Sequence, residues 1–224
     1  MNTEDIWVSS ISKKWLRYWN EKSSLIHEYQ KADWGSETSM INVSKAVIGH
    51  LKLSDNIKIL NAGCGTGKFE GLISEINPAL EIYGFDIIEK LIRICNNKVI
   101  KNKSEFLMAD TSRIPFKNNF FDAVISMGVL HCSDAPADKI IEELSRVTKI
   151  GGEIIITCAN KEFDKNYPID LRKDFTYFGS DFFIKNFKKN NIKLVKIGSV
   201  STLTGNIGKI NEYHNLFVKG VKVS

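Results

Sequence analysis

The sequence predicts an α/β fold, in which a mostly parallel sheet is covered by helices on both faces. Two observations support this prediction: short apolar runs of the kind found in buried strands, and amphipathic segments that alternate with them. Such alternation is typical of βαβ units with parallel strands. The runs expected to form these strands are residues 57–62, 81–86, 105–110, 123–127 and 153–159.

Helices are expected between the strands because apolar residues recur there at helical spacing. Stripes of this kind cover residues 69–76, 88–95 and 140–147. The third helix is expected to start after Asp134 and Pro136, and Gly151-Gly152 supplies its stop and the turn into the next strand. The sequence thus accounts for each connection by a helix or a loop.

The pattern changes after residue 159. Residues 160–179 show no period and predict a long loop with a short helix. Ser180 is expected to cap a further helix, and Ile192–Val200 and His214–Val223 are expected to form two more strands. The alternation in the last strand suggests an edge of the sheet.

Three alternating glycines, Gly63, Gly65 and Gly67, follow the first strand. Because glycine has no Cβ, the backbone here can turn sharply and lie against a ligand. The spacing argues against a nicotinamide or flavin site, since Lys68 occupies the place of the third glycine. It also argues against a P-loop, since Phe69 stands where a hydroxyl would hold magnesium. The loop therefore predicts a backbone-lined pocket for another nucleoside-bearing cofactor.

Six sequence blocks in order extend this interpretation: residues 60–67, 82–86, 106–110, 120–126, 129–131 and 144–156. With them the chain resembles the class I S-adenosylmethionine-dependent methyltransferases, specifically the small-molecule branch of ubiquinone-type and "type 11" enzymes. The resemblance covers roughly residues 57 to 160. It implies a Rossmann-like sheet of seven mostly parallel strands whose last strand is antiparallel.

The resemblance also implies a division of the chain. Residues 1–50 would form an N-terminal helical lid or substrate segment, and residues 51–224 the methyltransferase core, within one structural domain overall. The first segment is rich in aromatic residues, whose faces suit a sulfonium or a bound substrate. The alternative is that they pack the extra helices onto the sheet. The candidate substrate contacts are Tyr18, Tyr29, Trp34, Arg172 and Tyr177.

The cofactor implied by the resemblance is S-adenosylmethionine, with S-adenosylhomocysteine as product. The glycine loop is expected to bind the methionyl part through free N–H groups, Asp86 the ribose hydroxyls, Asp110 and Thr111 the adenine edge, and Ile87 the adenine face. A turn or a helix cap is the alternative role for each aspartate. Asn61 departs from the acid common in the family, which predicts a weaker pull on the methionyl ammonium. The complete expected cofactor set is Asn61, Gly63, Cys64, Gly65, Gly67, Asp86, Ile87, Asp110, Thr111 and Met127.

His131 is the candidate general base. It follows the fourth strand at the carboxyl edge of the sheet, and its unperturbed pKa lies near neutrality. The alternative is a structural role in its loop. We expect in-line, metal-free methyl transfer, because the chain's histidines are isolated and offer no ligand spacing.

Composition sets outer bounds. A chain of 224 residues with 43% hydrophobic residues suits one globular domain. Its four cysteines are widely spaced, which favours reduced buried thiols and a cytoplasmic location. No apolar run has the length of a membrane span, and no signal-peptide pattern is expected.

The expected acceptor is a small molecule. The net charge of +5 comes from scattered lysines, and [DNS]-P-P-[YFW] is absent after the fourth strand, so nucleic acid is disfavoured. The alternatives are a catalytically silent cofactor-binding partner subunit, an RNA or protein methyltransferase, and, least favoured, an aminopropyltransferase. The oligomeric state is left open.

Overall fold

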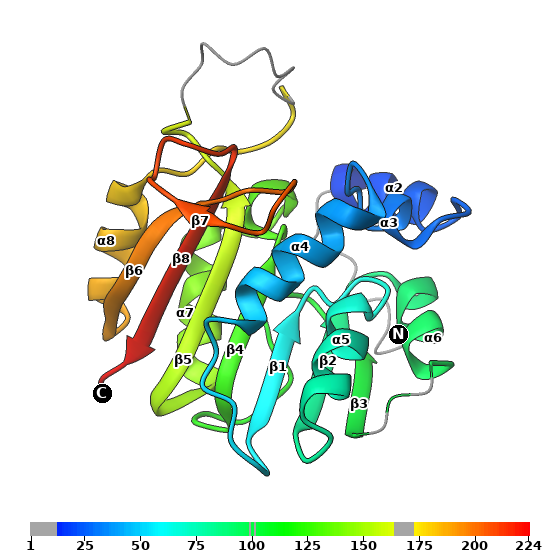
Figure 1. Cartoon of the computed structure of the whole chain (residues 1–224), viewed down its shortest axis with the longest axis horizontal. Coiled ribbons are helices and arrows are strands. Elements are labelled where there is room, and N and C mark those ends of the chain that lie inside the picture. Colours follow the sequence, from blue (N-terminus) through cyan, green and yellow to red (C-terminus); the bar gives the residue numbers. More distant parts are fainter. Residues whose placement is uncertain (1–12, 99, 101, 164–172) are drawn as a thin grey trace.

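The computed structural model describes residues 13–98, 100, 102–163 and 173–224 (Figure 1). Its helices are α2 (Lys13–Lys22), α3 (Glu28–Lys31), α4 (Glu37–Ile48), α5 (Lys68–Ile76), α6 (Glu89–Asn96), α7 (Ala137–Val147) and α8 (Ser180–Lys189), with a 3-10 turn, η1, at Leu130–Cys132. Its strands are β1 (Lys58–Ala62), β2 (Glu81–Asp86), β3 (Lys103–Met108), β4 (Phe121–Met127), β5 (Thr148–Ala159), β6 (Ile192–Val200), β7 (Ile207–Gly208) and β8 (Asn215–Lys222).

Within the described residues the strands form one sheet of eight strands in the order β3-β2-β1-β4-β5-β8-β6-β7. Strands β1 to β5 pair in parallel, and β8 runs antiparallel to both β5 and β6. The Rossmann-like α/β prediction and the antiparallel last strand are confirmed. The expectation that this strand lies at an edge of the sheet is wrong, because β8 pairs with β5 on one side and with β6 on the other. The expected count of seven strands missed β7, because a strand of two residues carries no periodic signal.

The sheet separates two hydrophobic cores, because side chains alternate between its faces. Leu60, Val124 and Ile156 pack with residues of α7 and α8. Ile59, Ile125 and Ile155 pack with residues of α4, α5 and α6 on the other face. Helices therefore cover both faces, as the sequence predicts, and hold the strand ends that form the site in fixed register.

Helices α2 and α3 lie beyond the carboxyl ends of the parallel strands (Figure 1). On one side the Trp15 amide donates to Asp134, and Trp19 Nε1 donates to the Cys132 carbonyl. On the other side Lys98 after α6 forms an ion pair with Glu28 of α3. Helices α2 and α3 thus contact both the segment after β4 and the end of α6, and they extend along the carboxyl edge of the sheet between them.

Two further sequence expectations can be compared with the fold. All four cysteines are buried free thiols, as expected. In the part of the chain that the structure describes, none of the helices combines the length and the apolarity that crossing a membrane requires.

Arg146 of α7 fixes the segment that follows β3. Its guanidinium donates to the carbonyls of Ile114 and Phe116, each at 2.7 Å, and to both carboxylate oxygens of Glu143 at 2.7 and 2.8 Å. Glu143 in turn accepts from the Ile114 amide at 2.8 Å. Because Glu143 is buried, this network ties the segment just beyond Asp110 to a helix of the core.

We expect Arg146→Ala to lower the free energy of unfolding by about 2–4 kcal/mol, because it leaves a buried carboxylate and two carbonyls without their donor. The exposed Arg93, which pairs with Glu89 on α6, offers a matched control. Arg93→Ala should change stability by less than about 0.5 kcal/mol. Urea unfolding of both variants tests this, and equal midpoints would contradict a structural role for the Arg146 network.

Candidate active site

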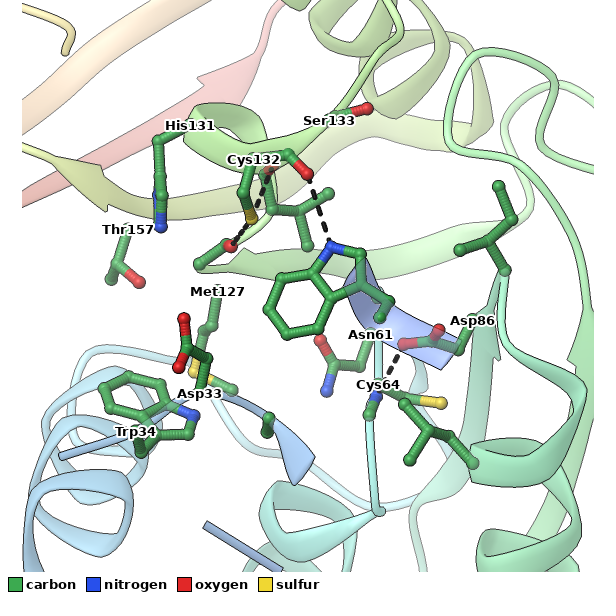
Figure 2. A pocket seen from close by; sticks show the side chains of 18 of the residues that line it. Asp33, Trp34, Asn61, Cys64, Asp86, Met127, His131, Cys132, Ser133 and Thr157 are labelled. Carbon is green, nitrogen blue, oxygen red and sulfur yellow. Dashed lines mark hydrogen bonds between the residues drawn. The ribbon is translucent and has the colours of Figure 1, made fainter. Parts of the chain in front are cut away.

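A cavity of about 490 Å³ opens at the carboxyl ends of β1, β2 and β4. In this sheet order the chain leaves β1 in one direction and reaches β4 on its other side, which is where open α/β sheets bind ligands. Figure 2 shows side chains that line it. The predicted site residues that line the cavity are Asn61, Gly63, Cys64, Gly65, Asp86, Ile87, Asp110, Thr111, Met127, Trp34 and His131.

The glycine loop owes its shape to backbone that other residues rarely adopt. Gly63 has φ +82°, and a Cβ there would lie 2.3 Å from Cγ2 of Val129. Gly67 has φ +74° and starts helix α5; it is absent from the cavity lining. A Cβ on Gly67 would meet Cys95 Sγ at 3.0 Å. These two glycines are therefore required by protein packing.

The amides of the loop differ from the expectation of free N–H groups. Gly63 and Cys64 both donate to the Phe85 carbonyl at 2.9 Å, and Gly67 donates to the Cys64 carbonyl at 3.0 Å. Gly65 donates to Asp86 Oδ2 at 3.0 Å. The structure corrects the expectation for these four amides: those of Gly63, Cys64 and Gly65 join the loop to the end of β2, and that of Gly67 closes a turn within the loop.

Asp86 ends β2 and faces the cavity (Figure 2). Its Oδ2 accepts from Gly65 and its Oδ1 from the Ile88 amide, both at 3.0 Å. Burial raises the pKa of Asp86, and these amide hydrogen bonds oppose that rise. Each carboxylate oxygen can accept a second hydrogen bond, so Asp86 can still receive two hydroxyl groups.

Asp110 and Thr111 lie just after β3, which ends at Met108 and not at the expected Asp110. The Ser112 amide donates to Asp110 Oδ1 at 2.7 Å, so Asp110 forms the turn that was its alternative role. Both residues also line the cavity, together with Ile87. A turn aspartate at this place can hold the backbone of Thr111 toward a ligand.

Asn61 lies near the end of β1 and is 2% exposed. Its Nδ2 donates to Glu70 Oε1 at 2.8 Å. Within the described ranges, neither Asn61 Oδ1 nor the buried Thr66 Oγ1 has a hydrogen-bond partner, and both residues line the cavity. Buried polar atoms in this state are suited to a polar ligand.

His131, in the 3-10 turn after β4, reaches the cavity near Thr157 (Figure 2). Its Nδ1 accepts from the Ala159 amide at 3.2 Å. The ring lies against Phe175, with centroids 4.4 Å apart. Because Nδ1 is an acceptor, the neutral ring carries its proton on Nε2.

The predicted substrate contacts are dispersed. Trp34 lines the cavity, whereas Tyr18, Tyr29 and Tyr177 do not, and Arg172 lies outside the described residues. Tyr29 stacks on the ring of His27. Tyr18 instead packs edge-on against Trp15 and Trp19 of its own helix. Both tyrosines therefore take part in local packing on the N-terminal segment.

Asp33 and Phe175 are among the cavity residues that were not predicted as site residues from the sequence. The Asp33 carboxylate accepts from Tyr18 Oη at 2.5 Å and from Lys22 Nζ at 2.8 Å. Tyr18 does not line the cavity itself, but its hydrogen bond holds Asp33 there. Asp33 has φ +54°, the left-handed conformation that aspartate tolerates after a helix end. An aspartate just beyond a short helix is the signal that could have found it.

Part of the chain matches a known protein family. The family described as "Methyltransferase domain", type 11, matches residues 60–156, the segment from β1 into β5. Over this segment the chain is a class I S-adenosylmethionine-dependent methyltransferase domain. The family confirms the recognition from sequence, and S-adenosylmethionine as its cofactor.

Two curated relatives of this methyltransferase domain are tRNA enzymes by name. The tRNA (carboxymethyluridine(34)-5-O)-methyltransferase of Arabidopsis thaliana is 45% identical over 101 residues, which are 44% of this chain and 23% of that protein. "Probable tRNA methyltransferase 9B" of Mus musculus is 31% identical over 114 residues, 48% of this chain and 24% of that protein. The matched segments thus span about a quarter of these relatives' length.

A solved structure shares the fold. It is a chain of the complex between the Haloferax volcanii Trm112 methyltransferase activator and a methyltransferase, with a TM-score of 0.68 and 16% identity. The match covers 82% of this chain and 90% of that chain.

The relatives correct the expected acceptor. The sequence analysis disfavoured nucleic acid as a partner, but two relatives that match this methyltransferase domain, at 45% and 31% identity, are tRNA methyltransferases by name. The error has a physical cause: the cofactor half carries the recognisable motifs, and the acceptor is selected by other segments.

The residues of the site fit the cofactor. Asp86 offers two acceptor oxygens, and the buried Asn61 Oδ1 and Thr66 Oγ1 offer polar atoms that have no partner in the described part of the chain. The cofactor carries matching hydroxyl and ammonium donors. The acceptors of the cavity floor therefore match the donors of the cofactor.

We expect Asp86→Ala to raise the dissociation constant for S-adenosylhomocysteine by about 10-fold or more, because a hydrogen bond to a charged group contributes roughly 1.5–3 kcal/mol. Glu89→Ala, at an exposed position at the start of α6, is the control and should leave the constant unchanged. Calorimetry measures both, and circular dichroism checks that both variants fold. Equal affinity of the two variants would remove Asp86 from the cofactor site.

Proposed function

We propose that this protein transfers the methyl group of S-adenosylmethionine to an oxygen of a carboxymethylated uridine in tRNA. The observation that carries the proposal is the 45% identity over 101 residues to the Arabidopsis tRNA (carboxymethyluridine(34)-5-O)-methyltransferase. The acceptor is a proposal because that match covers 44% of this chain and 23% of the relative.

The chemistry of such an acceptor agrees with the site. S-adenosylmethionine supplies a methyl group already activated by its positive sulfur. A carboxylate oxygen is ionised at neutral pH and is itself the nucleophile, so no residue has to remove a proton. The protein mainly has to align and dehydrate the reacting groups.

His131 suits orientation of a carboxylate. Because its Nδ1 accepts from Ala159, the neutral ring carries its proton on Nε2, which makes Nε2 a hydrogen-bond donor. Donors of this kind hold a carboxylate oxygen in place. This role supports the proposed acceptor, and it differs from the general base expected from the sequence.

The cavity also offers surfaces for a nucleobase. Trp19, Trp34 and Phe175 line it, and RNA-binding proteins commonly stack unpaired bases on aromatic rings. A base in a single-stranded loop is already unpaired, so its entry into a cavity costs little. Lys31 also lines the cavity, and a cation there favours an anionic acceptor.

The test is transfer of a labelled methyl group by the purified full chain. The acceptors are tRNA from cells that carboxymethylate uridine but lack this methylation, tRNA from cells unable to carboxymethylate uridine, and a panel of phenols and quinols. We expect label only in the first. Label in the small molecules alone would overturn the proposal, and bound cofactor without any turnover would favour the silent partner subunit.

One arm of the assay adds a Trm112-type activator. The reason is that a structural neighbour was solved as a complex with Trm112. Label in tRNA that appears only in this arm would make the activator part of the proposed enzyme.

A donor role for His131 predicts that His131→Gln lowers kcat by less than about 10-fold, because glutamine keeps an N–H donor. A general base typically contributes about 10²- to 10⁴-fold. With a carboxylate acceptor and saturating cofactor, kcat of both proteins should be independent of pH from about pH 6.5 to 9. A loss of 100-fold or more, with a missing basic limb in the variant, would restore the general-base assignment.

A further inference from the structure

Helix α5 carries a buried carboxyl group that the proposed chemistry does not use. Glu70 is 0% exposed and lies in the first turn of α5, directly behind the glycine loop. Burying a carboxyl group is costly unless it has a specific partner. Its partner here is a residue of the cavity.

Glu70 Oε1 accepts from Asn61 Nδ2 at 2.8 Å. In the described part of the chain Glu70 Oε2 has no hydrogen-bond partner, and neither has Asn61 Oδ1. Asn61 is itself buried and lines the cavity, where Figure 2 draws its side chain. The Asn61 amide thus joins an enclosed carboxyl group to the cofactor site.

The partner determines which end of the amide faces the cavity. An ionised carboxylate only accepts hydrogen bonds, so Asn61 must turn its NH₂ group toward Glu70. The opposite end, Oδ1, is then left as the acceptor on the cavity side. Without Glu70 the amide could rotate by half a turn and present its NH₂ group, which repels a positive ligand.

We propose that Glu70 is a positioning residue, which holds Asn61 so that Oδ1 accepts a hydrogen bond from the ammonium group of S-adenosylmethionine. The inference rests on the cofactor assignment and not on the identity of the methyl acceptor. It explains how an amide at position 61 can accept from the ammonium group, although an acid was expected there. The negative charge is on Glu70, which lies behind Asn61 and is joined to it by a hydrogen bond.

The charge on Glu70 should couple binding to pH. Burial raises the pKa of Glu70 to about 7, and the hydrogen bond from Asn61 opposes the rise. Of the charges around it, Lys98 favours the ionised form, Asp86 opposes it, and the Cys64 thiol is held neutral by burial. From the packed helix α4, Glu37 is neutralised by Lys68 and Lys45 is exposed.

The sign follows from linkage. A bound ammonium favours ionised Glu70, so the pKa of this carboxyl falls on binding and a proton is released. Affinity is then highest above pH 7 and weakens as pH falls through about 7. If Glu70 only stabilised the helix start, its replacement would change stability and leave this pH dependence in place.

The experiment is calorimetry of S-adenosylhomocysteine binding to the full chain at pH 6, 7 and 8. For the wild-type protein we expect affinity about 10-fold weaker at pH 6 than at pH 8. Glu70→Gln should weaken binding at pH 8 by roughly 3- to 10-fold and remove the pH dependence, because glutamine allows both amide orientations. Glu75→Gln, at an exposed position of the same helix, is the matched control and should behave as wild type.

A swapped pair provides the second test. In the double variant N61D/E70Q, the amide introduced at position 70 can donate to one oxygen of the carboxylate introduced at position 61. The other carboxylate oxygen then faces the cavity, so affinity at pH 8 should return to within about 3-fold of wild type. Thermal unfolding checks that each variant folds.

Two results would overturn the positioning role of Glu70. One is unchanged affinity and pH dependence in Glu70→Gln, and the other is no recovery of affinity in the folded swap. Absence of S-adenosylhomocysteine binding by the wild-type protein would instead overturn the cofactor assignment.

Discussion

The site depends on the join between the ends of β1 and β2. The Phe85 carbonyl accepts two amides of the glycine loop, and the adjacent Asp86 carboxylate accepts a third, that of Gly65. Because β1 and β2 are paired in parallel with Ala62 opposite Phe85, the loop is held in a fixed position at the carboxyl edge of the sheet. Asp86 consequently has two duties: it completes the loop and offers its remaining acceptor capacity to a ligand.

Several carboxylates line the cavity, although the chain as a whole is positively charged. Asp33, Asp86 and Asp110 line the cavity, although the chain carries a net charge of +5. Carboxylates close to a ligand favour a cofactor with positive sulfonium and ammonium groups. A positive net charge favours association with a polyanion over longer distances, in keeping with the proposed tRNA acceptor. The two tendencies act at different ranges and do not conflict.

Sequence could predict the parts of the fold that have a period. The five parallel strands, both helical layers and the antiparallel last strand all have apolar patterns set by burial. Asp86 could be predicted because it ends β2. Features set by contacts between distant segments had no such signal. Asp33 enters the cavity because Tyr18 and Lys22 hold it, and Phe175 does so by lying against His131. Two amides of the glycine loop are likewise occupied by the carbonyl of Phe85, on the next strand.

Asn61 illustrates how a departure in sequence becomes intelligible in three dimensions. An aspartate at this position would place a second carboxyl group within hydrogen-bond distance of Glu70, in a site closed to water. Two carboxylates so close cannot both be ionised, and one would hold a proton at neutral pH. An amide avoids this conflict because it donates to Glu70 and still offers an acceptor to the cavity. The residue at position 61 is therefore constrained by position 70, a dependence that no motif confined to the glycine loop could express.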